Sequence, residues 1–253
     1  MSVSSVFDVA AECNRLLKPD RFQDWDGAVN GLQVENRGSV RRIAAAVDAT
    51  VGTVRQAVES DADFLLVHHG LFWSPTYPWT GPRYRLIKML LEHDLAVYAA
   101  HLPLDAHPRL GNSARLCAEL GFDRLRPFFP CKGHHVGFRT NTRLPRETLV
   151  RRLAKVTRNP VTLLPGGPAI CQRIGVVTGG AGAELAQATA EGVDTFITGE
   201  GPHWTFGQAE MLGVNVLYAG HYATETFGVK ALAKHLSRKF GLPWTFIHRP
   251  SGL

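Results

Sequence analysis

The sequence has few cysteines and no pattern that would pair them. Its four cysteines lie far apart and none forms a C-x-x-C motif, so the sequence predicts neither a disulfide framework nor a thiolate zinc site. No apolar run is long enough to cross a membrane. The first helical stretch carries Asp8 and Glu12 where a secretion signal would be apolar. We therefore expect a protein of a reducing compartment, the cytoplasm, with no membrane partner.

The sequence also lacks the GxxxxGK[ST] motif that cradles nucleotide phosphates, and it has no low-complexity segment. With 253 residues, 45% of them hydrophobic, the chain can bury a large core. Its net charge of +6 suits phosphate-bearing partners, but the basic residues are dispersed along the chain. A nucleotide and a nucleic acid are therefore both candidate partners, and any phosphates must be held by scattered arginine, lysine or histidine side chains.

The chain contains an internal duplication. Residues 42–70 (RIAAAVDATVGTVRQAVESDADFLLVHHG) align without a gap with residues 173–201 (RIGVVTGGAGAELAQATAEGVDTFITGEG). Each segment reads as a strand, an alanine-rich amphipathic helix and a second strand. The correspondence continues from VYAAHLPLD (97–105) to LYAGHYATE (217–225). The repeat predicts two related α/β halves, each with a mainly parallel sheet.

Two prolines and a glycine interrupt the alternation of strands and helices in residues 126–135 (RPFFPCKGHH) and suggest a domain boundary there. We predict a first α/β domain over residues 1–128 and a second over residues 129–253. A helix is expected over 6–17, followed by a loop that Trp25 anchors on the core. The segment from residue 244 (WTFIHRPSGL) reads as a final strand and a short tail.

Ligand-type side chains gather at the predicted carboxyl ends of the strands, where α/β proteins usually place their sites. They are His68, His69, His101 and Asp105 in the first half, and Glu200, His221 and Glu225 in the second. Two H-x-x-x-[DE] motifs put an imidazole and a carboxylate on the same face of a helical turn. Such groups suit iron, zinc or manganese, and carboxylates can bridge two ions.

Single histidines are more often structural or surface groups, but three ligand-like pairs at matched strand ends favour a metal site. Adjacent His68 and His69 are expected to point to either side of their strand and to reach different ions. Glu200 occupies the position equivalent to His69; it is a general base or substrate holder, or it pairs with an arginine. The aromatic side chains of Trp73, Trp204 and Phe72 either stack on a nucleotide base or line a pocket wall or a subunit contact.

Five motifs resemble those of a known family: NGLQVE (30–35), VHHGLFW (67–73), AHLPLDAHPRLGN (100–112), ITGE (197–200) and AGHYATE (219–225). They are similar to the dinuclear-metal-centre proteins known as type 2 GTP cyclohydrolase I homologues, or Nif-three-like proteins, in particular their short YbgI-like branch. The resemblance covers almost the whole chain. It implies two interlinked three-layer α/β domains, assembled as a toroidal homohexamer with the metal pair facing an internal cavity.

The resemblance also implies functional residues. Two divalent metal ions per subunit would be held by His68, His69, Asp105, His221 and Glu225. His101 matches a motif position as well, as a weaker ligand or as a partner that orients Asp105. We name His101 and Glu200 as the catalytic candidates. In the implied reaction, water activated by the metal pair attacks C8 of the guanine ring of GTP, and formate is released.

The predicted function is therefore a dinuclear metal-dependent hydrolase that acts on a nucleotide. The alternative is a metal-binding protein for metal storage or delivery, which needs the same ligands but no substrate pocket. A third hypothesis is a basic ring that binds nucleic acid, with an affinity that falls steeply with salt. The middle domain of the longer family members is absent from this chain, so no function that resides there is expected.

Overall fold

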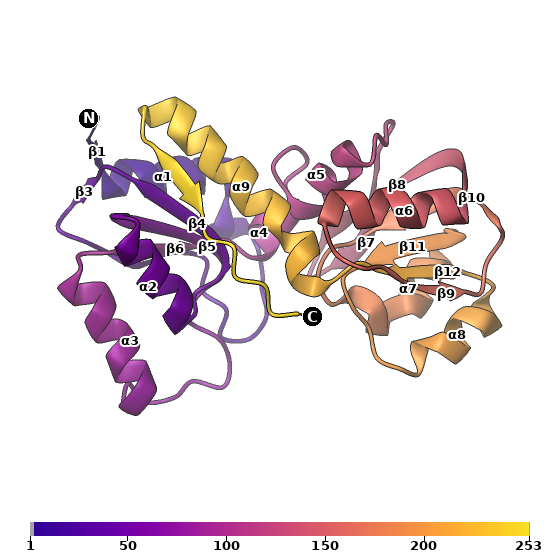
Figure 1. The fold of residues 1–253 in the computed structure, drawn as a ribbon, viewed down its shortest axis with the longest axis horizontal. Coiled ribbons are helices and arrows are strands. Elements are labelled where there is room, and N and C mark those ends of the chain that lie inside the picture. The colour runs from indigo at the N-terminus through magenta and orange to yellow at the C-terminus, as the bar shows by residue number, and fades with distance from the viewer. Residues whose placement is uncertain (1–2, 253) are drawn as a thin grey trace. The chain divides into compact units, whose positions relative to one another are not determined.

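The computed structural model describes residues 3–252 and divides them into two compact units. The first unit comprises residues 3–104 and 228–249, and the second comprises residues 105–227 and 250–252. Each unit is a β-sheet covered by helices on both faces (Figure 1). The predicted α/β class with three layers per unit is confirmed.

The first unit is built on a five-stranded sheet in the order β13-β4-β5-β6-β2, accompanied by a short antiparallel pair of β1 and β3. Its elements are β1 (Ser4–Ser5), α1 (Val6–Leu17), the 3-10 helix η1 (Pro19–Arg21), β2 (Gly31–Val34), β3 (Ser39–Val40), β4 (Ile43–Asp48), α2 (Val51–Glu59), β5 (Phe64–His69), α3 (Gly81–Glu92), β6 (Ala96–Ala99), β13 (Trp244–Phe246) and the later part of α9 (His221–Phe240).

Side chains point alternately to the two faces of the first sheet, so each face has its own core. On one face, Leu65 and Val67 of β5 pack with Val54 of α2 and Leu90 of α3. On the other face, the Tyr98 hydroxyl of β6 donates a hydrogen bond of 2.7 Å to Asn14 of α1. Helix α1 spans the residues predicted for it, because the Ser5 hydroxyl accepts from the backbone N–H of Phe7 at its start.

The second unit is built on a six-stranded sheet in the order β7-β8-β10-β11-β12-β9. Its elements are α5 (Asn112–Glu119), β7 (Arg126–Cys131), β8 (His134–Pro145), α6 (Arg146–Thr157), β9 (Thr162–Pro165), β10 (Ile170–Val176), the 3-10 helix η2 (Ala181–Glu184), α7 (Leu185–Ala190), β11 (Thr195–Thr198), α8 (Thr205–Leu212), β12 (Asn215–Tyr218) and the start of α9; α4 (Leu102–Asp105) leads into it. Leu116 of α5 and Leu149 of α6 pack with Ile174 on one face, and α7 and α8 cover the other (Figure 1).

The two sheets repeat the same arrangement. Strands β4, β5 and β6 are parallel neighbours in that order, and so are β10, β11 and β12. An antiparallel strand lies beside the third strand of each set, β2 beside β6 and β9 beside β12. The predicted duplication is therefore confirmed, and in each unit the residues that follow these strands lie at one edge of the sheet.

The segment expected to mark a domain boundary is instead a β-hairpin inside the second unit. Strands β7 and β8 are joined by Lys132 and Gly133, whose φ angles of 49° and 83° suit a tight two-residue turn. Pro127 and Pro130 are tolerated because β7 is an edge strand. The two units exchange at 104/105 and 227/228, whereas the predicted boundary at 128/129 lies within β7. The predicted final strand, β13, pairs with β4 of the first unit.

None of the helices within residues 3–252 has both the length and the apolar character needed to cross a lipid bilayer.

Candidate metal centre

The first unit holds two of the predicted ligands at the end of its central strand. Nδ1 of His68 lies 2.8 Å from the carbonyl oxygen of Ala100, and Nδ1 of His69 lies 2.8 Å from Oδ1 of Asp48. Carbonyl and carboxylate oxygens only accept hydrogen bonds, so each Nδ1 carries the proton. Each Nε2 therefore keeps a lone pair that can bind a metal ion.

His101 follows β6 and is oriented in the same way by a carboxylate. Its Nδ1 lies 2.8 Å from Oδ1 of Asp24, a residue 77 positions earlier in the chain. Burial of Asp24 opposes its ionisation, but hydrogen bonds from His101, Asn30 and the Trp25 backbone lower its pKa to about 2. Asp24 is therefore an ionised acceptor that fixes the orientation of the His101 ring.

These three imidazoles form one cluster, defined by His68, His69 and His101, in which each contributes one ring nitrogen. The three nitrogen atoms all lie within 4.8 Å of one another. His68 is fully buried, whereas His69 and His101 are partly exposed. A group of imidazoles oriented in this way is a suitable binding site for a divalent transition-metal ion.

Trp73 forms a wall beside this cluster. Its ring meets His101 edge-on with centroids 4.9 Å apart and meets His69 at 5.7 Å. The indole N–H donates to the carbonyl oxygen of Gly70 at 3.1 Å, which fixes the ring's orientation. Trp204, the other tryptophan considered from the sequence, is 54% exposed on the second unit.

The second unit places His221 between two carboxylates. His221 begins α9 directly after β12; its Nδ1 lies 2.7 Å from Oε1 of Glu200 and its Nε2 lies 3.1 Å from Oε2 of Glu225. Burial of His221 disfavours its charged form, but the contacts with Glu225 and Glu200 outweigh burial and raise its pKa to about 9. The sequence left Glu200 as a general base, a substrate holder or an arginine partner; in the structure its carboxylate accepts a hydrogen bond from Nδ1 of His221.

A glycine makes room for the Glu225 carboxylate, whereas the glycine beside Glu200 is not crowded. A Cβ atom on Gly179, whose φ is +73°, would lie 2.3 Å from Oε1 of Glu225. A Cβ atom on Gly180 would lie 3.6 Å from Oε1 of Glu200. A side chain at position 179 would therefore occupy space that the buried Glu225 carboxylate needs.

Asp105, also predicted as a ligand, is buried at the end of α4. Its Oδ1 accepts a hydrogen bond of 2.8 Å from the side-chain amide of Asn112. Its assignment as a ligand stays a prediction.

The sequence did not reveal the two carboxylates that orient the histidines of the first unit. Asp48 occupies the repeat position where the second half has Gly179, and this mismatch in the alignment was the only signal available. Asp24 adjoins Trp25, which was expected to anchor the loop on the core. That expectation is wrong, because the Trp25 side chain is 49% exposed and Asp24 holds the loop through Asn30, His101 and Leu102.

Comparison with known proteins identifies relatives over the whole chain. The family model described as Duf34/NIF3 (NGG1p interacting factor 3) matches residues 4–251. A protein of Deinococcus radiodurans named GTP cyclohydrolase 1 type 2 homolog is 44% identical over 232 residues, 90% of this chain and 88% of that protein. Among solved structures, TTHA1606 from Thermus thermophilus is 39% identical and the protein ybgI is 33% identical. Each has a TM-score of 0.91 and covers 98% of this chain and 100% of the solved chain.

Proposed function

The chain belongs to the Duf34/NIF3 family, and we propose that it is a dinuclear metal-dependent hydrolase that acts on a nucleotide. The observation that carries this proposal is the orientation of the His68, His69 and His101 rings, whose Nδ1 atoms are each held by an oxygen acceptor. Histidines that bind metal are typically held in this way. Relatives named GTP cyclohydrolase 1 type 2 homolog support GTP as the first substrate to test.

The ligands of the two proposed ions are His68, His69, Asp105, His221 and Glu225, with His101 as a further nitrogen donor. A mixture of imidazole nitrogen and carboxylate oxygen fits iron, zinc or manganese. When bound, a pair of such ions supplies Lewis acidity and lowers the pKa of water toward neutrality, which favours hydrolysis.

The protein's own contribution is to hold these donors in place before the metal binds. Asp48 and Asp24 fix the ring tautomers of His69 and His101, and Glu200 fixes the ring of His221. In this proposal Glu200 is a positioning residue, since its carboxylate already accepts the Nδ1 proton of His221. Trp73 keeps water from the ring edges of His69 and His101.

The proposal can be tested by metal analysis of the purified protein, followed by incubation with a panel of nucleotides that includes GTP. Wild type should contain bound divalent metal and release formate from GTP. Glu225→Ala should reduce both metal content and turnover at least about tenfold. The matched control is Glu59→Ala, which removes an exposed carboxylate from α2 and should leave both unchanged.

The results separate this proposal from the alternatives. Full-rate turnover by Glu225→Ala would remove the proposed site from consideration. Stoichiometric metal without turnover of any nucleotide would identify a metal storage or delivery protein instead.

We also propose that the chain assembles as a homohexamer, as its resemblance to the family implies. An exposed apolar stretch that comprises α8 and the residue before it supports an interface: Trp204, Phe206, Met211 and Leu212 are all exposed. Light scattering coupled to size-exclusion chromatography should give the mass of a hexamer. Met211→Glu with Phe206→Glu should yield a smaller species.

A further inference from the structure

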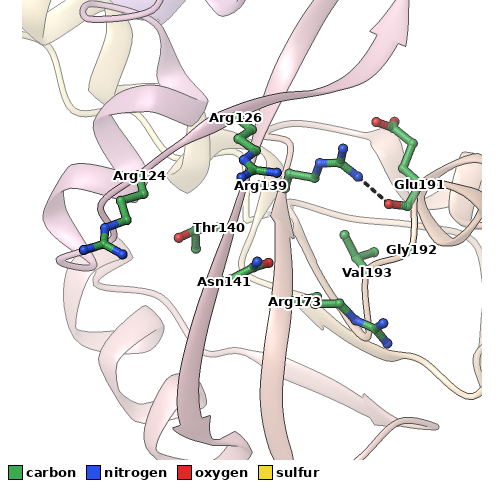
Figure 2. Close-up of a pocket in the computed structure, with 9 residues that line it drawn as sticks. All are labelled: Arg124, Arg126, Arg139, Thr140, Asn141, Arg173, Glu191, Gly192 and Val193. Atoms are coloured by element: carbon green, nitrogen blue, oxygen red, sulfur yellow. Dashed lines mark hydrogen bonds between the residues drawn. The ribbon is translucent and has the colours of Figure 1, made fainter.

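The second unit contains a pocket of about 340 Å³ lined by four arginines: Arg124, Arg126, Arg139 and Arg173 (Figure 2). We infer that this pocket binds the phosphate group of a small phosphorylated ligand. Its volume lies within the range of small-molecule sites.

The register of the sheet brings the arginines together. Arg126 of β7 is directly opposite Arg139 of β8, and Arg173 of β10 is opposite Asn141 of β8. Residues 139 and 141 share one face of β8, because side chains alternate along a strand. Three guanidinium groups therefore project from the same face of three neighbouring strands, and Arg124 joins them from the residues just before β7.

Placing two arginines directly opposite each other destabilises a sheet unless an anion lies near both. Arg124, Arg126 and Arg139 form no salt bridge with any residue between 3 and 252. Arg173 does have a partner, Oδ2 of Asp194 at 3.5 Å. The positive charge of the pocket is thus only partly compensated.

The acidic groups at the pocket are already engaged. The Glu191 carboxylate accepts from the backbone N–H of Phe129 at 2.8 Å, and the Glu191 carbonyl oxygen accepts from Arg139 (Figure 2). Asp194 accepts from the backbone N–H groups of Gln172 and Arg173. Glu191 and Asp194 together neutralise at most two of the four positive charges. The positive charge that they leave uncompensated matches the charge of a phosphomonoester, which is about −1.5 to −2 at pH 7.

Guanidinium groups favour phosphate because their planar N–H donors match two phosphate oxygens at once. Val193 and Gly192 close one side of the pocket, so the recess suits one phosphate group with a small attached moiety. A nucleic acid would instead need a continuous track of cations. The ligand group assigned to this pocket is therefore a dianionic phosphate, which is either free phosphate or part of a small phosphorylated molecule.

This pocket is separate from the metal ligands of the second unit. Gly179 and Gly180, which adjoin Glu225 and His221, follow the end of β10, whereas Arg173 is the middle residue of that strand. Likewise Gly192 and Val193 precede β11, and Glu200 follows it. The two groups lie toward opposite ends of the parallel strands, and the inference does not depend on the proposed hydrolase activity.

The test measures binding of inorganic phosphate and of ribose 5-phosphate to the full chain by calorimetry at low ionic strength, after removal of metal with a chelator. Arg126→Gln and Arg124→Gln should each weaken binding roughly tenfold or more, the loss expected for a charged hydrogen bond. Arg152→Gln is the matched control; it removes an exposed guanidinium from α6, which covers the other face of the sheet.

Tighter binding of ribose 5-phosphate than of phosphate would assign the site to a phosphorylated molecule, and equal binding would assign it to free phosphate. Equal losses in Arg152→Gln and Arg126→Gln would overturn the inference, because the effect would then be one of net charge. Binding of single-stranded DNA that tightens with length and is lost in Arg126→Gln would also overturn it, in favour of a nucleic-acid site. Glu225→Ala should bind both probes as wild type does, which separates this result from any failure of the hydrolase proposal.

Discussion

Oδ1 of Asp48 lies 2.8 Å from Nδ1 of His69, at the ends of two neighbouring parallel strands. The residues are paired in the register of β4 and β5, so the sheet itself positions the carboxylate against the imidazole. His68 is held from the other neighbouring strand, through the carbonyl oxygen of Ala100 after β6. One strand end thus presents two rings, each oriented from a different side.

Asp48→Asn should lower divalent-metal affinity by about 10- to 100-fold, because the carboxylate that orients the Nδ1–H of His69 is lost. A competitive chelator titration measures this affinity. Asp61→Asn is the control: Asp61 is exposed, and Asn tolerates its φ of 54°. Equal affinities in Asp48→Asn and wild type would show that Asp48 has no part in metal binding.

Gly179→Ala should displace the Glu225 carboxylate and reduce metal content. The added Cβ would lie 2.3 Å from Oε1 of Glu225, and the left-handed backbone adds a cost of about 1 kcal/mol. Gly213→Ala isolates the backbone cost, because Gly213 has a φ of +65° and no atom within 4 Å of an added Cβ. Metal analysis and thermal unfolding should show metal loss in the first variant and a lower Tm in both. Full metal content in Gly179→Ala would contradict the expected displacement.

Glu12 links α1 to α9 within the first unit, and its removal should destabilise the protein in a pH-dependent way. The carboxylate accepts from Arg15 and contacts His235 at 2.8 Å and Lys239 at 3.1 Å. The Arg15 contact, aided by His235 and Lys239 and opposed by burial, holds the pKa of Glu12 well below its ordinary value of 4.5. Glu12→Gln should therefore lower the free energy of unfolding by about 1–3 kcal/mol at neutral pH.

The sign of the pH effect follows from the lowered pKa. Because folding favours the ionised form of Glu12, its stabilisation is complete above the unfolded-state pKa and is lost as the pH falls below 4.5. Urea unfolding at several pH values should show the difference between wild type and Glu12→Gln shrinking below that pH. Glu119→Gln, which removes an exposed partner of Arg115, should have little effect. A difference that grew on acidification would refute this explanation.

Arg126→Gln should raise the Tm of the ligand-free protein. Relief of the repulsion between directly opposed Arg126 and Arg139 is worth roughly 0.2–1 kcal/mol, or up to about 4 °C. High salt should reduce the gain, since exposed charges are screened. A lower Tm at low salt would show that Arg126 stabilises the ligand-free sheet.

Repetition and periodicity were sufficient to predict most of the fold. The ungapped match of residues 42–70 with 173–201 predicted two related parallel sheets and placed His68, His69 and Glu200 at strand ends. The hairpin at 126–135 was misread because prolines usually interrupt strands, and their tolerance in β7 depends on its place at the edge. That position is a tertiary property with no local signature.

The candidate sites were less predictable where they depend on partners distant in sequence. His101 is oriented by Asp24 from a loop 77 residues away, and no local spacing joins them. The arginine pocket likewise requires the register that places Arg126 opposite Arg139. Side chains that lie on one strand end could be found from the sequence, whereas those brought together by pairing across strands could not.

The return of the chain to its first sheet has a consequence for biosynthesis. Strand β13 pairs with β4, and His235 of α9 contacts Glu12 of α1, so the first unit incorporates segments made more than two hundred residues later. On the ribosome, the first unit therefore cannot be completed until residues 228–249 have been synthesised. The central stretch, residues 105–227, is continuous and can fold while the rest is still being made. Truncation near the carboxyl terminus should therefore affect the amino-terminal unit first.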